Sequence, residues 1–155
     1  MAEPSLFTDR EVLFLRELNR AGVPYMVVGL SAAALQGAPA VTQDIDLWFH
    51  DLSDPRFLNV VRSVGASYVP PGVNNPPLLV GEGVSLFDLV VHMHGLDSFE
   101  AEYAGSLDMT IVDGVVVKVL PLERIIASKQ AAGRDKDRVI LPVLIDALRT
   151  IREKD

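Results

Sequence analysis

The segment that decides the fold is YMVVGLSAAALQGAPAVTQDIDL, residues 25–47. Its first four residues are apolar and rich in aromatic and β-branched side chains, which predicts a short strand. The chain then turns at Gly29, and the alanine-rich residues 31–36 predict a helix that ends near Gly37. A second strand is predicted at 44–49, so the segment is a strand, a glycine turn, a short helix and a strand.

Acidic and apolar residues alternate from Asp44 in this second strand. A period of two places Asp44 and Asp46 on one face of the strand, with Ile45 on the other. An isolated Asp-x-Asp is more often a solvated strand face, so the pair needs further support before it is interpreted as a metal site.

That support comes from Asp88, which lies between Phe87 and Leu89 in the apolar segment 84–93, a predicted strand. A solitary charge in an apolar strand is costly, so a partner is expected. Three carboxylates that converge from two strands suit divalent magnesium, or manganese, bound against a nucleoside triphosphate. We therefore interpret Asp44, Asp46 and Asp88 as candidate catalytic residues and metal ligands.

The glycine turn is a candidate phosphate site. Gly29 follows a strand and precedes a helix, where backbone N–H groups attract anions and glycine permits close approach. Ser31 is placed to donate its hydroxyl to a phosphate oxygen. Alone this pattern is weak, because a plain strand-to-helix turn with Ser31 as N-cap would look the same; beside the carboxylates, the phosphate role is favoured.

Local signals place most of the remaining elements. Thr8 and Glu11 form a capping box before a helix, and Asp54 with the following proline opens another that runs to about residue 64. The four prolines of 70–77 predict a loop that overhangs the site. A hairpin with a type I′ turn is expected at 109–120, then helices at 121–132 and at about 139–152, the last only if Pro142 falls in its first turn.

Composition limits the class of protein. The chain has 155 residues, 49% of them hydrophobic, which fits one folded domain over residues 1–155. The net charge of −7 disfavours an extended nucleic-acid surface, although Lys129, Arg134, Lys136 and Arg138 form a local basic cluster. The absence of cysteine excludes disulfides and thiolate metal sites.

Targeting signals are not apparent. Glu3 and Asp9 stand where a signal peptide would carry basic residues, and no apolar run is long enough for a membrane span. We therefore expect a cytoplasmic protein without membrane contact. His92 and His94 share the strand parity of Asp88; a ligand role is open, and a solvated position is favoured.

Taken together, these residues resemble the DNA-polymerase-β-like nucleotidyltransferase superfamily. The likeness is strongest to its small bacterial branch, the minimal nucleotidyltransferases and AbiEii-type toxins. It is carried by residues 25–47, by LFDLVVH at 86–92 and by LPLERIIASKQAAGRDKD at 120–137. The resemblance implies an α/β (α+β) nucleotidyltransferase fold, with a central mixed sheet and helices mainly on one face.

The resemblance also implies an activity, which is transfer of a nucleoside monophosphate from a nucleoside triphosphate to a hydroxyl acceptor of unknown identity (RNA, protein or small molecule). It implies that Asp44 and Asp46 bind magnesium and that Asp88 completes the triad. Gly29 and Ser31 would contact the triphosphate, faced by Lys129, with Lys136 or Arg134 assisting.

This chain departs from the family pattern at three positions. Leu30 stands at the second glycine or serine, Ala40 where relatives carry a basic residue, and Gln36 where they often carry histidine. These departures motivate a second hypothesis, a catalytically degenerate protein that binds a nucleotide or a partner, for example in a toxin–antitoxin system. A toxin or an antibiotic-modifying enzyme is a third. A second copy of the chain or an antitoxin is a candidate partner.

Overall fold

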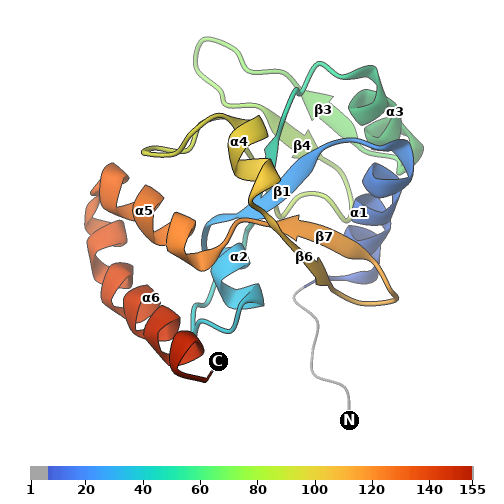
Figure 1. Ribbon diagram of the computed structural model, residues 1–155. Coiled ribbons are helices and arrows are strands. Elements are labelled where there is room, and N and C mark those ends of the chain that lie inside the picture. Colours follow the sequence, from blue (N-terminus) through green and yellow to red (C-terminus); the bar gives the residue numbers. More distant parts are fainter. Residues whose placement is uncertain (1–6, 155) are drawn as a thin grey trace.

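The computed structural model describes residues 7–154, which form a mixed sheet with helices packed around it (Figure 1). The helices are α1 (Asp9–Ala21), α2 (Gly29–Leu35), α3 (Pro55–Ser63), α4 (Phe99–Ala104), α5 (Leu122–Ala132) and α6 (Asp135–Lys154). The strands are β1 (Tyr25–Val28), β2 (Ile45–Phe49), β3 (Ser67–Val69), β4 (Leu78–Val80), β5 (Phe87–Val90), β6 (Leu107–Thr110) and β7 (Val116–Val119).

The sheet has the strand order β3-β4-β5-β2-β1-β7-β6. β2 runs antiparallel to β1 and parallel to β5, and β7 runs parallel to β1. The α/β class with a central mixed sheet, predicted from the sequence, is confirmed. The register pairs Asp46 of β2 with Asp88 of β5, so these residues lie side by side on the same face of the sheet.

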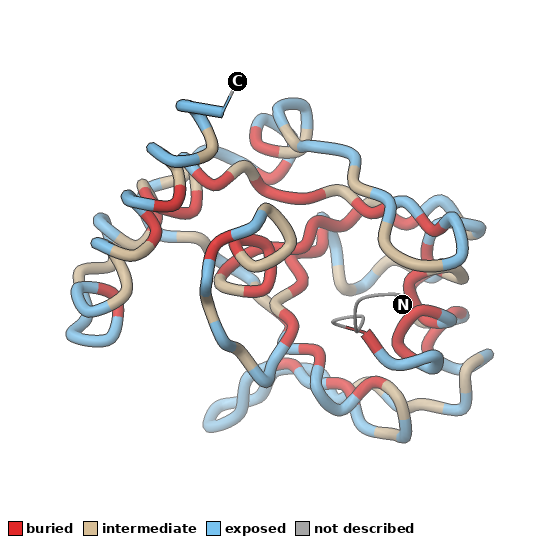
Figure 2. Tube along the Cα trace, turned by 90° about the horizontal axis from the view of Figure 1, so that it is seen from below, coloured by how far each residue is buried: buried red, intermediate tan, exposed pale blue. Residues whose placement is uncertain are grey.

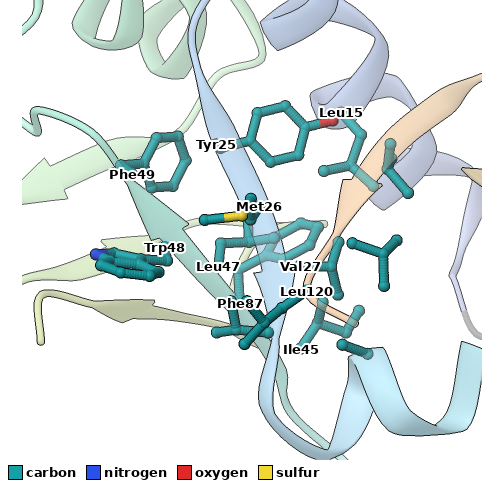
Figure 3. Close-up of a cluster of buried hydrophobic side chains, with 14 of the residues drawn as sticks. Leu15, Tyr25, Met26, Val27, Ile45, Leu47, Trp48, Phe49, Phe87 and Leu120 are labelled. Carbon is teal, nitrogen blue, oxygen red and sulfur yellow. The ribbon is translucent and has the colours of Figure 1, made fainter. Parts of the chain in front are cut away.

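One face of the sheet carries the main hydrophobic core. Alternate residues of the central strands point to it, among them Val27, Leu47 and Phe87 (Figure 3). Helices α1 and α3 cover this face: the Phe14 ring lies 5.3 Å from that of Phe87, and α3 packs beside α1. Burying such aromatic and aliphatic side chains supplies most of the stability of the fold.

The opposite face is only partly covered. Trp48 of β2 meets Phe99 of α4, with ring centroids 5.4 Å apart in an edge-on arrangement. Helices α5 and α6 run beside each other at one end of the sheet, where α2 joins them to β1 and β2 (Figure 1). Figure 2 shows burial concentrated in the central strands and along the inner sides of the helices. Asp88 stays exposed on this open face.

Several local predictions are confirmed. Thr8 and Glu11 form the reciprocal capping box of α1, and Asp54 caps α3 ahead of its proline. Asp113 and Gly114 both have positive φ, 57° and 73°, as a type I′ turn between β6 and β7 requires. The glycine after α5, Gly133, ends that helix in the left-handed conformation.

Two predicted boundaries are wrong. The strand expected at 84–93 is limited to Phe87–Val90, because its partner β2 is itself only five residues long. The last helix begins at Asp135, not near residue 139, so Pro142 lies in its interior. The start moves upstream because the Asp137 carboxylate accepts the Arg134 backbone N–H and so caps the helix early. The sequence analysis also did not resolve β3, β4 and α4.

Gln36, at the end of α2, ties the glycine-turn region to the C-terminal helices. Its amide nitrogen donates to the carbonyls of Ala32 and Leu120, and its amide oxygen accepts the N–H of Leu122. This departure from the family pattern thus has a structural role: it fixes the position of α5 relative to α2.

In the described range 7–154, none of the helices is both long enough and apolar enough to span a bilayer. Glu3 lies outside the described residues. The single domain over 1–155 stays a prediction.

Candidate active site

The site is built around the turn between β1 and α2, where the backbone of Gly29 touches the side chain of Asp46. Gly29 has φ +66°, a conformation that side chains rarely adopt. A Cβ at this position would lie 2.2 Å from Asp46 Oδ2. The carboxylate therefore rests directly on the turn, and only glycine leaves room for it.

Ser31 holds β2, the strand that carries Asp46, through hydrogen bonds to the backbone. Its side chain is buried, and its hydroxyl donates to the Val28 carbonyl (2.9 Å) while accepting the Asp46 N–H (3.2 Å). The sequence analysis expected the Ser31 hydroxyl to donate to a phosphate oxygen. In the structure the hydroxyl is instead engaged in these two internal hydrogen bonds. Its observed contacts hold β1, α2 and β2 together under Asp46.

The three predicted carboxylates lie near one another on the open face. Asp46 and Asp88 are direct neighbours on parallel strands, and Asp44 lies just before β2, with its carboxylate within hydrogen-bonding reach of Asp88. The aspartate in β5 thus points towards the earlier pair and not away from it.

Burial and mutual repulsion show in the titration of these groups. Burial, and then the negative charge of Asp88, raises the pKa of Asp46 to about 6, although Lys129 and Lys136 act in the opposite direction. Burial, followed by the charge and proximity of Asp44, raises the pKa of Asp88. The site holds more negative charge than its surroundings neutralise.

This donor set fits a divalent cation with oxygen ligands. Crowded carboxylates that repel one another are stabilised by a bound cation, and magnesium takes a few carboxylates with the rest of its shell from water and phosphate. Among residues 7–154, no three His, Asp or Glu side chains lie close enough together to hold a metal ion by themselves. An incomplete protein shell of this kind suits magnesium better than zinc, which prefers nitrogen and sulfur ligands.

A cavity of about 300 Å³ opens beside Asp46 between the sheet and α5. Gly29 and Asp46 form one wall, and basic side chains form the other: Lys129, Arg134 and Lys136. Arg138, the fourth member of the basic cluster, does not line it and instead faces Asp135 at 3.8 Å. The cavity therefore has the Asp46 carboxylate on one side and cations on the other, an arrangement that suits a metal-bound anion, while Asp44 and Asp88 lie outside its lining.

Asp137, at the start of α6, organises the cationic wall. It is fully buried, and its carboxylate lies 2.7 Å from Arg134 Nε and 3.4 Å from Lys129 Nζ. The hydrogen bonds from Arg134, outweighing burial, lower the pKa of Asp137 to about 2. The sequence analysis did not assign this residue a role. Its spacing of three from Arg134 at a helix start was the available signal.

The sequence analysis favoured a solvated position for His92 and His94, and both side chains are exposed. Both follow the end of β5, both line the cavity, and their rings are 4.8 Å apart in an edge-on contact. The expected strand ends before them, so strand parity with Asp88 was not the right guide.

No family model and no curated protein matches this chain. Solved structures do. ANT(2″)-Ia in complex with adenylyl-2″-tobramycin is 15% identical, with a TM-score of 0.59 over 91% of this chain and 90% of that chain. The solution structure of the antibiotic-resistance factor ANT(2″)-Ia is 16% identical, with a TM-score of 0.59 over 88% of this chain and 80% of that one.

A third match is an antigenic nucleotidyltransferase-like protein from Paracoccidioides brasiliensis, 19% identical, with a TM-score of 0.57 over 93% of this chain and 78% of that chain. The chain has the nucleotidyltransferase fold. This confirms the fold implied by the sequence resemblance, while membership of the small bacterial branch stays a prediction.

In this nucleotidyltransferase fold, the contact between Gly29 and Asp46 is testable by Gly29→Ala. We expect nucleoside triphosphate affinity with magnesium to fall at least tenfold, since the added Cβ displaces the Asp46 carboxylate. Calorimetric titration measures this loss. Gly37→Ala is the matched control: Gly37 also has positive φ (98°), yet a Cβ there meets nothing within 4 Å. Both variants should lose roughly 1 kcal/mol of stability from backbone strain, and equal triphosphate affinities in the two would contradict the role of the contact.

The raised pKa of Asp46 predicts a pH-dependent stability in metal-free buffer. The pKa of Asp46 is about 6 in the folded state, above the 3.8 of a solvated aspartate, so the folded state holds the proton more tightly and stability falls as pH rises from about 4 to 6. Asp46→Asn should therefore unfold with a free energy roughly 1–3 kcal/mol higher than wild type at pH 7. Urea unfolding between pH 4 and 8 measures the gap, which should shrink towards pH 4.

If Asp46→Asn and wild type differed by the same free energy of unfolding at every pH, ionisation of Asp46 would not be the cause of the difference. Asp97→Asn makes the same chemical change at an exposed loop position and should leave stability close to wild type across the range.

Asp137 should be needed for stability. Asp137→Asn leaves Lys129 and Arg134 without their buried counter-charge, so we expect a loss of roughly 3 kcal/mol in the free energy of unfolding at pH 7. Asp135→Asn, an exposed position in the same helical turn, should change it by less than about 0.5 kcal/mol. Equal effects of the two substitutions in urea unfolding would contradict this role for Asp137.

Proposed function

We propose that this protein is a magnesium-dependent nucleotidyltransferase that moves a nucleoside monophosphate from a nucleoside triphosphate to a hydroxyl acceptor. The observation that carries the proposal is the cavity with Asp46 and Gly29 on one wall and three basic side chains on the other. The fold supports the same reaction class, because it is the fold of solved nucleotidyltransferase-like proteins.

In this proposal Gly29, Lys129 and Lys136 hold the triphosphate, with Arg134 assisting. The backbone of the turn allows a phosphate to approach closely, and the cations neutralise phosphate oxygens. Asp137 keeps Lys129 and Arg134 directed at the cavity through its ion pairs. Positioning and charge neutralisation would supply most of the rate enhancement.

Asp44, Asp46 and Asp88 would ligate the magnesium ion, for which manganese is the substitute. When bound, the metal would neutralise the charge that develops on the phosphates during transfer. Asp88 is more exposed than its neighbour Asp46 and is therefore the group best placed to take the proton of the acceptor hydroxyl. The acceptor oxygen then bonds to the α-phosphorus as the bond to pyrophosphate breaks.

The departures in the glycine turn favour one alternative. The Ser31 hydroxyl forms only internal hydrogen bonds, to the backbone of Val28 and Asp46. Leu30 stands where the family pattern has a second glycine or serine. The alternative is a catalytically degenerate protein, which binds a nucleotide or a partner without turnover and acts as a binding module, for example in a toxin–antitoxin system. A homodimer or an antitoxin complex, and a cytoplasmic location, remain predictions under either function.

Incubation with α-labelled nucleoside triphosphates, magnesium and a panel of acceptors tests the proposal. Wild-type protein should transfer label, and Asp44→Asn, Asp46→Asn and Asp88→Asn should each reduce transfer by at least about 10²-fold, because each removes a ligand of the metal. Transfer that is the same in wild type and in all three variants would contradict the enzymatic role.

Calorimetric titration of the same proteins separates the two functions. Triphosphate binding that needs magnesium, without any labelled product, would favour the binding module. Asp97→Asn is the matched control, since it lies in a loop outside the cavity lining and should transfer label at the wild-type rate.

A further inference from the structure

The open face of the sheet beyond Asp88 is apolar where water would favour polar side chains. The register places Ser67 and Val69 of β3, Leu78 and Val80 of β4, and Asp88 of β5 on one face, where three of the four residues beyond Asp88 are apolar. We call Val69, Leu78 and Val80 the apolar shelf. Their exposed fractions are 37%, 37% and 49%, respectively. A one-sided antiparallel sheet normally puts polar residues on its solvent face, so the shelf calls for an explanation.

The shelf is not a by-product of an unpacked hairpin, because the other face of the same strands is well packed. Tyr68 of β3 meets the Phe57 ring of α3 at 5.3 Å, edge-on, and Leu79 of β4 is buried. The loop 70–77 that joins the two strands is ordered by Asn75, whose side-chain amide donates to the carbonyls of Pro70 and Pro76. The hairpin therefore presents the shelf on a packed support; Figure 1 shows β3 and β4 beside α3.

The shelf continues directly from the candidate site. Leu78 is the cross-strand partner of Asp88, so the apolar surface begins one strand away from the carboxylate proposed to take the acceptor proton. The triphosphate cavity lies on the other side, next to Asp46 and α5, and none of the shelf residues lines it. A hydroxyl that reaches Asp88 while the cavity holds a triphosphate would come from a molecule seated on the shelf.

The charged residues of the hairpin limit which class of molecule can bind on the shelf. The sequence from 63 to 91 contains no Lys, Arg or His, so nothing in the hairpin attracts a phosphorylated acceptor or an RNA end. Its only acids are Glu82 and Asp88, and Glu82 lies 3.7 Å from Arg10. The shelf itself therefore offers no side chain that would pair with a charged group, and the carboxylates at its edge, Asp44, Asp46 and Asp88, are the ones assigned to the magnesium ion in the proposed function.

The exposed area of the apolar shelf limits the size of the acceptor molecule. Three side chains exposed by 37–49% offer roughly 200 Å² of apolar surface, against about 800 Å² per partner in a stable protein–protein interface. This is enough for one face of a small molecule. Resting on the proposed function, we infer that the acceptor is a small uncharged hydroxyl compound with an apolar face, which lies on Val69, Leu78 and Val80 with its hydroxyl at Asp88.

Amide chemical-shift mapping of the full chain tests this inference with four probes, naphthalenemethanol, inositol, tobramycin and ATP with magnesium. Naphthalenemethanol should shift the amides of 67–69, 78–80 and 88. Inositol, uncharged but without an apolar face, and the polycation tobramycin should leave them unmoved. Naphthalenemethanol shifts confined to other regions, or equal shifts with inositol, would overturn the inference.

The double variant Leu78→Thr/Val80→Thr places strand-forming, β-branched threonine at both positions and reduces the apolar surface. Its affinity for naphthalenemethanol should fall roughly tenfold. Val116→Thr is the matched control, an exposed valine (44%) on β7, away from the shelf in the strand order, and should bind the probe as wild type does. An unchanged affinity in the double variant would overturn the inference.

The same samples separate this inference from the proposed function. If ATP shifts the amides around Gly29 and Lys129 while naphthalenemethanol misses the shelf, the inference fails and the nucleotidyltransferase proposal stands. If ATP with magnesium does not bind, both fail. Light scattering covers a further occupant: a wild-type dimer that becomes monomeric in the double variant would mean that a second copy of the chain covers the shelf, and would overturn the inference.

Discussion

The contact between a backbone turn and a carboxylate is the constraint on which the site depends. Gly29 adopts a left-handed conformation at the end of β1, and the Asp46 carboxylate occupies the space where any side chain at 29 would stand. Ser31 adds two hydrogen bonds that join β1 to β2 beneath that contact. A charged group is thus held partly buried, at an energetic cost that shows in its raised pKa. Strongly shifted pKa values of this kind cluster at functional sites.

Opposite charges are arranged around this point by two separate parts of the chain. The sheet supplies the carboxylates, through the register that sets Asp46 beside Asp88. The C-terminal helices supply the cations, and buried Asp137 keeps Lys129 and Arg134 in place. Gln36 connects the two parts by hydrogen bonds from α2 to the start of α5. The polarity of the cavity is therefore a property of the whole fold, and the same geometry leaves a neutral, apolar surface on the far side of Asp88.

Much of the candidate site was predictable because it depends on local patterns. Alternation over 44–49 and the apolar surroundings of Asp88 predicted carboxylates on two strands, and the structure pairs Asp46 with Asp88 and has Asp44 near Asp88, while their role as metal ligands stays a prediction. Gly29, Lys129 and Lys136 likewise line one cavity. Ser31 is the exception: its hydroxyl turned inward because the neighbouring backbone groups of Val28 and Asp46 needed partners, a demand that exists only once β1 and β2 pair.

What the sequence by itself determined are the elements that follow from short-range chemistry: the capping box of α1, the turn at Asp113 and Gly114, the helix stop at Gly133, and the strand–turn–helix–strand unit around Gly29. What only the tertiary structure decided are the residues whose role depends on distant partners. His92 and His94 reach the cavity because β5 stops where β2 stops, and Asp137 is a buried counter-ion because α6 packs against α5. The physical reason is that periodicity and capping depend on neighbours along the chain, whereas burial, ion pairing and an unpartnered sheet face depend on which segments pack together in space.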